Sequence, residues 1–342
     1  MGGKKAILNV VAFTGGGHVP SARFRVRQYR EPLQQFDVAL NEQLLRTGAY
    51  PPAGRIVRPL WGVQRLSELA VAIARSRDAD VTLLQREMIS SFKTLEGFTK
   101  RPRVLDVDDA VHLQRGGNFA RKIAAGCDRI IAGNAFLADY YSQWSKDVVI
   151  MPTGVDSDTY VPASANADAA EVVIGWIGTS ANFIYLRQIE SALARFLDAV
   201  PTAHLLVVSN ASPEFAAIAP TRWTFRPWSE AREISDIQSM DIGIMPLADS
   251  EWARGKCSFK MLQYMACGLP VVVSPVGMNA EVLNQSEIGI GALKDADWID
   301  GLKMLALSPD LRQKLGQNGR ALVEQHYAVN ALVPQFARHL RG

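Results

Sequence analysis

The sequence predicts an α/β protein with two Rossmann-like halves in tandem, each built on a parallel, doubly wound sheet. Short β-branched runs alternate with amphipathic segments along the chain, which is the pattern of such sheets. The alternation pauses at residues 160–170, where YVPASANADAA is small, contains proline and lacks periodicity. At 342 residues the chain also exceeds one ordinary domain. We therefore expect an N-terminal domain over 1–160, a linker over 161–170 and a C-terminal domain over 171–327.

The first half contains five predicted strands and four predicted helices. Short apolar runs predict the strands, at 6–13, 81–84, 103–107, 129–132 and 148–152. Helical spacing of apolar residues predicts the helices, at 21–36, 63–77, 118–126 and 135–145. The first run, AILNVVAF, follows two lysines as in a signal peptide. It is short, however, and no small-residue cleavage pattern follows, so we interpret it as a buried strand.

The second half repeats this alternation. Its predicted strands lie at 171–178, 203–210, 221–228 and 241–247, and in LPVVVS near residue 272. Its predicted helices lie at 182–199, 229–240, 259–267, 295–307, 309–326 and 328–341. Two such halves place ligands at the carboxyl ends of their strands.

Composition and charge exclude several classes of protein. A hydrophobic content of 48% with 21% charged residues is that of a soluble globular protein, and no apolar run approaches the roughly 18 residues of a membrane span. The three cysteines are odd in number and lack metal-ligand spacing, which favours reduced thiols in the cytoplasm. The first 160 residues carry 22 Lys and Arg against 16 Asp and Glu. This basic half suits an anionic surface or a phosphate-bearing acceptor, and no nucleic-acid motif is present.

Residues 254–277, RGKCSFKMLQYMACGLPVVVSPVG, are the most informative segment. Ser258 is a favourable N-cap, Gly268 stands where a helix ends, and a buried strand follows. Three cations surround the helix start: Arg254, Lys256 and Lys260. A helix N-terminus beside clustered cations attracts phosphate. The alternative is an ordinary helix–turn–strand unit with surface lysines.

Three glycines follow the first predicted strand: Gly15, Gly16 and Gly17. GGGHVPSARF is not the dinucleotide fingerprint, so we do not expect NAD binding. The basic run that follows, Arg23, Arg25 and Arg27, is either a solvated face or a contact to an acceptor phosphate or a lipid.

Three carboxylates, Asp106, Asp108 and Asp109, stand at the end of a predicted strand. One interpretation is a DxD metal site, as in single-domain GT-A glycosyltransferases. The tandem halves argue against it, and we expect no metal site and no cofactor.

The 254–277 segment resembles the donor-binding segment of the retaining GT-B glycosyltransferases of the large group 1 family (family 4). The hinge PTGVD, with Tyr160 after it, and the late helical pair with Leu315-Gly316 and Gly319-Arg320 resemble the same family. The resemblance implies two domains facing across a cleft, with a last helix, 328–342, that returns to the N-terminal domain.

We expect donor-binding and catalytic residues from these patterns together. Gly178, Thr179 and Ser180 end the first strand of the second half, where N–H and hydroxyl groups can meet a diphosphate. Candidate donor-binding residues are therefore Gly178, Thr179, Ser180, Arg254, Ser258, Lys260, Gln263, Gly277 and Glu281. The resemblance implies that Asp108 contacts the donor sugar, and we expect Lys256 to hold the phosphate, so these two are the candidate catalytic residues. Candidate acceptor-binding residues are Gly16, Gly17, His18, Arg23 and Arg25.

The predicted function is transfer of a sugar from a nucleotide-sugar to a glycan, lipid-linked or small-molecule acceptor. The resemblance implies retention, no required metal and bacterial polysaccharide assembly, and we expect a cytoplasmic protein that associates peripherally with the membrane. Two family glutamates are replaced here by Gly255 and Gln263. These departures favour, as one alternative, a nucleotide-sugar-binding protein with impaired catalysis. The other alternative is a nucleotide-sugar 2-epimerase, which needs acid–base residues for which five histidines offer few candidates.

Overall fold

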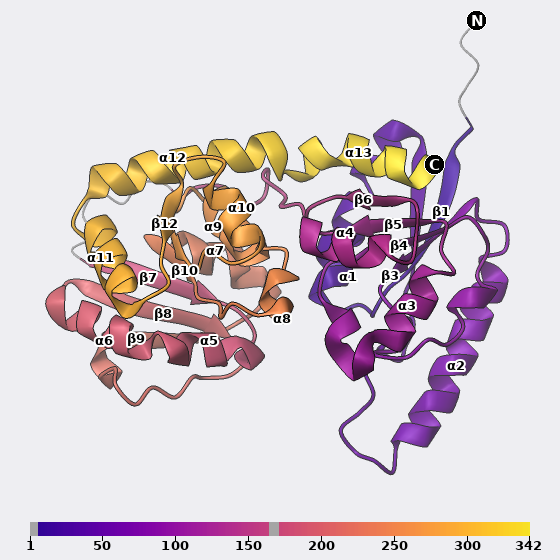
Figure 1. The fold of residues 1–342 in the computed structure, drawn as a ribbon, viewed down its shortest axis with the longest axis horizontal. Helices are drawn as coiled ribbons and strands as arrows, with labels where there is room; N and C mark the ends of the chain where they lie inside the picture. The colour runs from indigo at the N-terminus through magenta and orange to yellow at the C-terminus, as the bar shows by residue number, and fades with distance from the viewer. Residues whose placement is uncertain (1–5, 164–170) are drawn as a thin grey trace, which may run out of the picture. The chain divides into compact units, whose positions relative to one another are not determined.

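The computed structural model describes residues 6–163 and 171–342 and divides the chain into two compact units (Figure 1). The N-terminal unit comprises the chain up to Gly154 together with Gly255–Cys257 and Val329–Gly342. The C-terminal unit comprises Val155–Arg254 and Ser258–Ala328. The chain thus passes from one unit to the other at Gly154, ahead of the predicted linker, and most of that linker lies outside the described residues.

The N-terminal unit is built on a six-stranded, wholly parallel sheet with the order β2-β1-β3-β4-β5-β6. Its strands are β1 (Leu8–Phe13), β2 (Val38–Gln43), β3 (Val81–Gln85), β4 (Arg103–Val107), β5 (Arg129–Ala132) and β6 (Val148–Ile150). The order reverses between β1 and β3, which is where a doubly wound sheet opens a crevice for a ligand.

Five α-helices are described in the N-terminal unit, and the first of them is shorter than the sequence predicted. They are α1 (Pro20–Arg25), α2 (Arg58–Arg75), α3 (Asn118–Ala124), α4 (Ala135–Ser142) and α13 (Val329–Arg341). The predicted helix over 21–36 breaks after α1 into two short 3-10 helices, Arg27–Tyr29 and Pro32–Phe36. The break falls at Val26, where the backbone leaves helical geometry with a φ of −126°, and Pro32 stands at the first position of the second 3-10 helix, where no N–H group is needed.

Helix α13 completes the core of the N-terminal unit. Its apolar face packs against residues of the parallel sheet and of the segment after α1 (Figure 1). The rings of Tyr29 and Phe336 meet edge to face with 5.1 Å between centroids. The Arg129 guanidinium also donates to the His339 carbonyl oxygen over 2.9 Å. The last helix therefore buries apolar area that the sheet would otherwise expose.

The C-terminal unit has a second six-stranded parallel sheet, ordered β12-β11-β10-β7-β8-β9. Its strands are β7 (Val172–Ile177), β8 (Ala203–Ser209), β9 (Trp223–Pro227), β10 (Ile242–Met245), β11 (Val271–Val273) and β12 (Gly289–Gly291). The order reverses between β7 and β10. The segments that follow β7, β10 and β11 are consequently the expected ligand-binding segments.

Eight α-helices are described in this unit: α5 (Phe183–Gln188), α6 (Glu190–Ala199), α7 (Glu233–Gln238), α8 (Glu251–Arg254), α9 (Phe259–Ala266), α10 (Met278–Leu283), α11 (Asp295–Ala306) and α12 (Pro309–His326). The predicted helix over 182–199 is two helices, because the backbone leaves helical geometry at Ile189. The core of the unit surrounds the buried rings of Trp176, Phe196 and Trp298.

Candidate functional site

Helix α9 begins at the carboxyl edge of the C-terminal sheet, as the sequence predicted. It runs from Phe259 to Ala266, and Gly268 follows with a left-handed φ of +73°. This is the conformation of a glycine that ends a helix. Ser258 precedes α9 in a left-handed conformation, with φ of 50°. Its side chain makes no capping hydrogen bond, unlike the predicted N-cap, because capping needs an extended backbone.

Lys260, in the first turn of α9, lies against Gly178 at the end of β7. A Cβ atom at position 178 would lie 2.7 Å from the Lys260 Cε and 2.7 Å from the Trp176 ring. The missing side chain of Gly178 thus makes room for the lysine stem. The Lys260 side chain, from the first turn of α9, thus reaches the carboxyl end of β7 with its Cε carbon.

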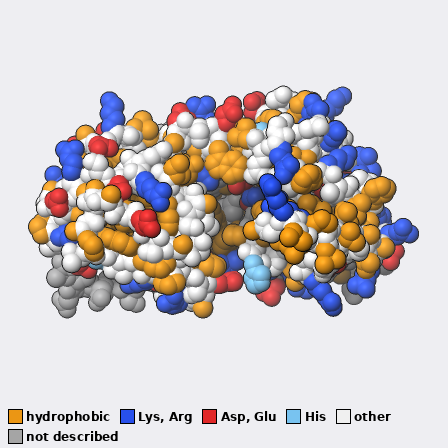
Figure 2. Space-filling model, turned by 90° about the horizontal axis from the view of Figure 1, so that it is seen from below, with side chains coloured by type: hydrophobic (Ala, Val, Ile, Leu, Met, Phe, Trp, Pro, Cys, Tyr) orange, Lys and Arg blue, Asp and Glu red, His pale blue; other side chains and the backbone are white. Residues whose placement is uncertain are grey.

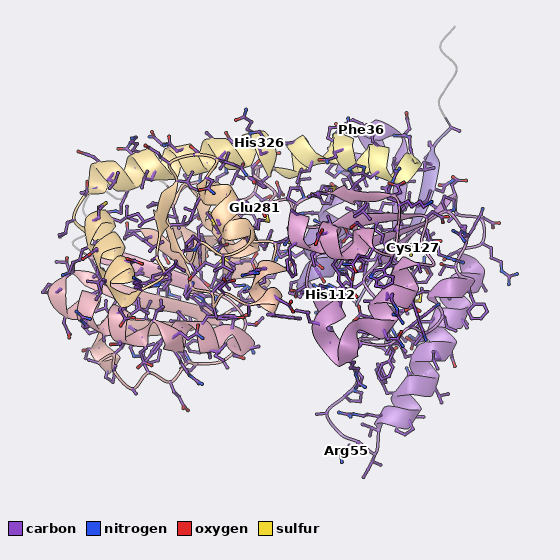
Figure 3. The ribbon with its side chains drawn as sticks, viewed as in Figure 1. Phe36, Arg55, His112, Cys127, Glu281 and His326 are labelled. Atoms are coloured by element: carbon purple, nitrogen blue, oxygen red, sulfur yellow. The ribbon has the colours of Figure 1, made fainter. Side chains whose placement is uncertain are left out.

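Two further segments of the C-terminal unit meet close to α9. Gly277, after β11, has φ of +55°, and a Cβ there would lie 2.8 Å from the Arg254 Cα. The backbone of α8 therefore approaches the β11–α10 turn at a position that favours glycine. The exposed Arg254 guanidinium forms a two-point ion pair with Asp249, at 2.8 and 2.9 Å. Glu281 is exposed in the first turn of α10 (Figure 3).

Thr179 and Ser180 follow β7 and are held by local hydrogen bonds. The Ser180 N–H donates to the Asn210 Oδ1 over 2.8 Å, and the Asn210 amide donates to the Ser180 Oγ over 3.1 Å. The Thr179 Oγ1 accepts from Asn182 over 2.8 Å. Asn210 comes directly after β8, so the carboxyl ends of two neighbouring strands are joined here. Sequence reasoning missed Asn210, although a polar residue at a strand end is a usable signal.

Gln263 occupies the interior of the C-terminal unit, which corrects its predicted role as a ribose-binding residue. Its side-chain amide donates to the Tyr160 hydroxyl over 3.0 Å and to the Glu233 carboxylate over 3.3 Å. Tyr160 and Trp228 also donate to Glu233. A glutamate at position 263 would place a second carboxylate against Glu233, which is 4% exposed. The buried carboxylate of Glu233 therefore accounts for a glutamine, rather than a glutamate, at position 263.

In the N-terminal unit, Arg25 and Asp106 form a fully buried ion pair. The Nη2–Oδ1 distance is 2.5 Å, and both side chains have no exposed surface. The remaining guanidinium nitrogen donates to the Met151 carbonyl over 2.8 Å. Burial opposes the charged form, but Asp106 outweighs it and raises the pKa of Arg25 above its usual value. This corrects the prediction that Arg25 contacts an acceptor.

Asp108 is paired with Arg86, which the sequence analysis did not single out. The Arg86 Nε donates to the Asp108 Oδ1 over 2.6 Å, and Gln85 donates to the same oxygen over 3.2 Å. Burial would raise the pKa of Asp108, yet Arg86 outweighs it and holds that pKa below the usual value. Arg86 follows β3 with a left-handed φ of 62°. A strained residue at a strand end is typical of functional sites.

The carboxylates of this region do not form the DxD arrangement of the alternative interpretation. Asp106 is held by Arg25, and Asp108 by Arg86. Within residues 6–163 and 171–342, no three His, Cys, Asp or Glu side chains are grouped as a metal site requires. That the reaction needs no metal ion stays a prediction.

A shallow pocket lies at the carboxyl ends of β1 and β3. It is lined by Gly15, Val19, Ser21, Ala49, Tyr50, Gln85, Arg86, Glu87 and Ser90. Burial raises the pKa of the Glu87 carboxyl. The pocket thus combines a guanidinium, a carboxyl and hydroxyl groups, which are the groups that bind sugar hydroxyls.

The predicted acceptor residues of the glycine loop flank this pocket rather than line it. The carbonyl oxygens of Gly16 and Gly17 accept from the Arg27 guanidinium, which also pairs with Glu42 at 2.7 Å. His18 is exposed, and the Arg23 guanidinium lies 4.6 Å from the centre of the Phe24 ring. Arg27 therefore fixes the loop in place.

Lys256 belongs to a short segment, Gly255–Cys257, that groups with the N-terminal unit. The Asn134 side chain donates to the Lys256 carbonyl oxygen over 3.0 Å, and the Cys257 thiol donates to the Asp108 carbonyl oxygen over 3.1 Å. Burial raises the pKa of Asp109, while Arg86 and then Lys256 act to lower it. The two predicted catalytic residues, Lys256 and Asp108, thus lie in one part of the N-terminal unit.

Comparison with known proteins identifies the fold and the family of the second domain. Residues 171–306 match the family model described as group 1 glycosyl transferases. Sucrose-phosphate synthase from Thermosynechococcus elongatus superposes with a TM-score of 0.72 at 15% identity, over 98% of each chain. Anabaena HepE, solved with UDP and glucose, gives 0.68 at 13% identity, over 98% of this chain and 100% of that one.

WaaG, described as a glycosyltransferase involved in lipopolysaccharide biosynthesis, gives a TM-score of 0.68 at 12% identity over 98% of this chain and 100% of WaaG. A comparison with curated protein sequences found no match. Identities this low establish the fold, and the match over 171–306 establishes the family of that domain. The chain therefore has the GT-B fold and carries a group 1 glycosyltransferase domain.

Proposed function

We propose that the protein transfers a sugar from a nucleoside-diphosphate sugar to a hydroxyl group of a glycan, lipid-linked or small-molecule acceptor. The observation that carries this proposal is the position of Lys260, in the first turn of α9 and against Gly178 at the end of β7. An ammonium group, a helix N-terminus and a strand end with no side chain together suit a diphosphate.

The donor lies in the C-terminal unit in this proposal, and the phosphate is the group that this unit grips. Charged hydrogen bonds from Lys260, and helix N–H groups, stabilise the diphosphate as negative charge develops on it. Thr179, Ser180 and the turn at Gly277 supply further polar groups around it. Lys256, Asp108, Arg254 and Glu281 remain candidate residues in the roles that the sequence analysis assigns.

The acceptor lies in the N-terminal unit, in the pocket beside β1 and β3. Arg86 and Glu87 offer a donor and an acceptor of hydrogen bonds to sugar hydroxyls. We infer retention of anomeric configuration from the family, with the donor phosphate helping to deprotonate the acceptor hydroxyl. We propose that the cations and the helix N-terminus carry the leaving-group chemistry without a required metal or cofactor.

We place the protein in the cytoplasm, peripherally associated with the membrane and active in polysaccharide assembly. Its three cysteines are free thiols, which suits a reducing compartment. The WaaG likeness favours an envelope or glycan product for a protein with this fold.

The decisive experiment compares Lys260→Ala with Lys303→Ala, a matched variant in α11, in binding of nucleoside diphosphates. UDP is the first probe, because HepE was solved with it. A charged hydrogen bond is worth about 1.5–3 kcal/mol, so Lys260→Ala should weaken binding by about ten- to a hundredfold. Isothermal titration calorimetry measures both variants. If UDP, GDP and ADP all bind Lys260→Ala as tightly as wild type, the donor site is misplaced.

A second candidate function is nucleotide-sugar binding without transfer. Gln263 faces Glu233 in the interior and brings no carboxylate to a donor. Incubation with nucleotide-sugars separates the two functions. Tight binding with no release of nucleoside diphosphate, with any acceptor or with water, would favour the binding protein over the transferase.

A further inference from the structure

The pocket at the carboxyl ends of β1 and β3 has walls that hydrogen bonds hold together. Its walls come from the segments that follow β1, β2 and β3. The Ala49 N–H donates to the Gly15 carbonyl oxygen over 3.1 Å, and the Ser90 N–H donates to the Ala49 carbonyl oxygen over 3.0 Å. The buried Arg65 guanidinium donates to one carbonyl oxygen after β2 and to one after β3. The shape of the pocket is therefore fixed by the fold before a ligand arrives.

Carboxyl groups outnumber cations at this pocket. The Arg86 Nε donates to Asp108 over 2.6 Å, and the Arg86 Nη2 lies 3.7 Å from the Asp109 carboxylate. Glu87, which is 8% exposed, brings a third carboxyl group to the pocket wall. Lys256 acts on Asp109 as a second cation. An incoming anion would thus meet cations that are already paired and one carboxyl group more than they balance, and like charges brought together repel.

Tyr50 lines the pocket and experiences the same charges. Burial raises the pKa of its phenol, the Arg86 charge acts to lower it, and the three carboxyl groups named above act to raise it further. The pocket thus opposes negative charge on a group placed at this position. The Tyr50 side chain is also 54% exposed, so its ring offers apolar area on which the C–H face of a sugar ring can lie.

The pocket also contains polar groups that suit a hydroxyl group. Because Arg86 donates to Asp108 through Nε, the N–H groups at the outer end of the guanidinium remain for a ligand. The Glu87 Oε1 accepts from the Ser91 N–H over 3.0 Å, which leaves Oε2 for a ligand. A hydroxyl group donates and accepts, so it can satisfy the guanidinium and the carboxyl group together. An ionised phosphate or carboxylate only accepts and cannot pair with a carboxylate.

The positive charge of the N-terminal half lies on the surface rather than in this pocket. Arg46 and Arg55 are exposed, and Figure 2 shows Lys and Arg side chains spread over the visible face of this unit. Arg27, beside the glycine loop, is bound to Glu42. Exposed cations are available to the membrane association proposed above. None of the helices that the structure describes has both the length and the apolar character of a membrane span.

We propose that this pocket takes an uncharged sugar residue of the acceptor and rejects a residue that carries a phosphate or a carboxylate. The sugar ring lies on Tyr50, and its hydroxyl groups pair with Arg86 and Glu87. A phosphate elsewhere on the acceptor, outside the pocket, is compatible with this arrangement. The inference rests on the proposed function, whose acceptor class it names, and it does not depend on which nucleotide carries the donor sugar.

The test is NMR titration of the full chain with pairs of sugars that differ in charge. The pairs are glucose, mannose and N-acetylglucosamine, each with its 6-phosphate. We expect a neutral sugar to bind at least about tenfold more tightly than its 6-phosphate. Tyr50→Ala should weaken that binding about fivefold. Phe98→Ala is the control, because Phe98 is 76% exposed in the same unit and does not line the pocket. Thermal unfolding checks that both variants fold.

A charge variant separates selection by charge from a merely structural role. Asp109→Asn keeps the shape of the side chain and removes one of the two carboxylates beside Arg86. It should narrow the preference for the neutral sugar at least about threefold, because the guanidinium is then less neutralised. Equal weakening of the neutral sugar and its 6-phosphate would instead show that Asp109 only supports the fold.

Four results would overturn the proposal: equal or tighter binding of a 6-phosphate, no binding of any of these sugars, tighter binding of cationic glucosamine than of glucose, or equal loss in Tyr50→Ala and Phe98→Ala. Calorimetry with UDP distinguishes this failure from failure of the proposed function. If UDP binds wild type and Tyr50→Ala alike while the sugars fail, only the assignment of the pocket is wrong. If UDP, GDP and ADP all fail to bind, the donor site is wrong and the sugar titrations still decide the pocket.

Discussion

The buried pair of Arg25 and Asp106 allows a prediction whose size follows from its geometry. Asp106→Ala removes the carboxylate that accepts from two nitrogens of the guanidinium and leaves a charge with no exposed surface. Removing one partner of a buried pair costs about 3–5 kcal/mol. At about 2–4 °C per kcal/mol for a domain of this size, the unfolding midpoint of the N-terminal unit should fall by roughly 6–20 °C.

Differential scanning calorimetry is the assay, and the C-terminal unit is an internal reference because Asp106 belongs to the other unit. The double variant Arg25→Met, Asp106→Leu replaces both charges with apolar groups and should recover most of the loss. It should also leave the KM for an acceptor near the wild-type value. A loss below about 1 kcal/mol in Asp106→Ala would refute the reasoning. A large increase in the KM for the acceptor in the stable double variant would also refute the reasoning, because it would mean that Arg25 takes part in acceptor binding.

Two further predictions concern titration and thiol chemistry. Because Arg86 depresses the pKa of Asp108, the stabilisation from this pair is present above about pH 4 and disappears as pH falls through the lowered pKa. Urea unfolding should therefore show that Asp108→Asn is less stable than wild type at neutral pH, with a difference in unfolding free energy that shrinks towards pH 3. A difference that does not change with pH would contradict the pairing of Asp108 with Arg86. Burial raises the pKa of Cys257 and Cys267, which are both buried, to about 12. Iodoacetamide at roughly pH 8 should alkylate these two thiols slowly in native protein and quickly in urea-unfolded protein, and fast labelling of either thiol in native protein would argue against buried, protonated groups.

Much of the fold was predictable because its elements are long or strongly patterned. Strands β4 and β5 and helix α12 begin and end at the predicted residues. Strand β2 was missed, since VALNEQ has few apolar residues and pairs with β1 alone, at the edge of the sheet. Strand β12 was missed because its three residues, GIG, carry no strand signal.

The candidate site was predictable only in part. Gly178 at a strand end and Lys260 at a helix start follow from local patterns, and the structure brings them into contact. The burial of Gln263 did not follow from pattern, because Glu233 is 30 residues away in the chain. Arg86 was overlooked because a single arginine after a strand resembles any surface residue until Asp108 is placed beside it.

By itself the sequence determined the two tandem parallel sheets, the helix that starts at Phe259 and the basic character of the N-terminal half. These depend on hydrophobic period, on glycine and proline, and on charge, all of which act over a few residues. Only the tertiary structure decided which charges are available to a ligand. Arg25 and Asp106, 81 residues apart, neutralise each other in the core, while Arg55 and Arg58 remain at the surface. Packing makes that choice, because a charge in the interior persists only where a distant partner compensates for its lost hydration.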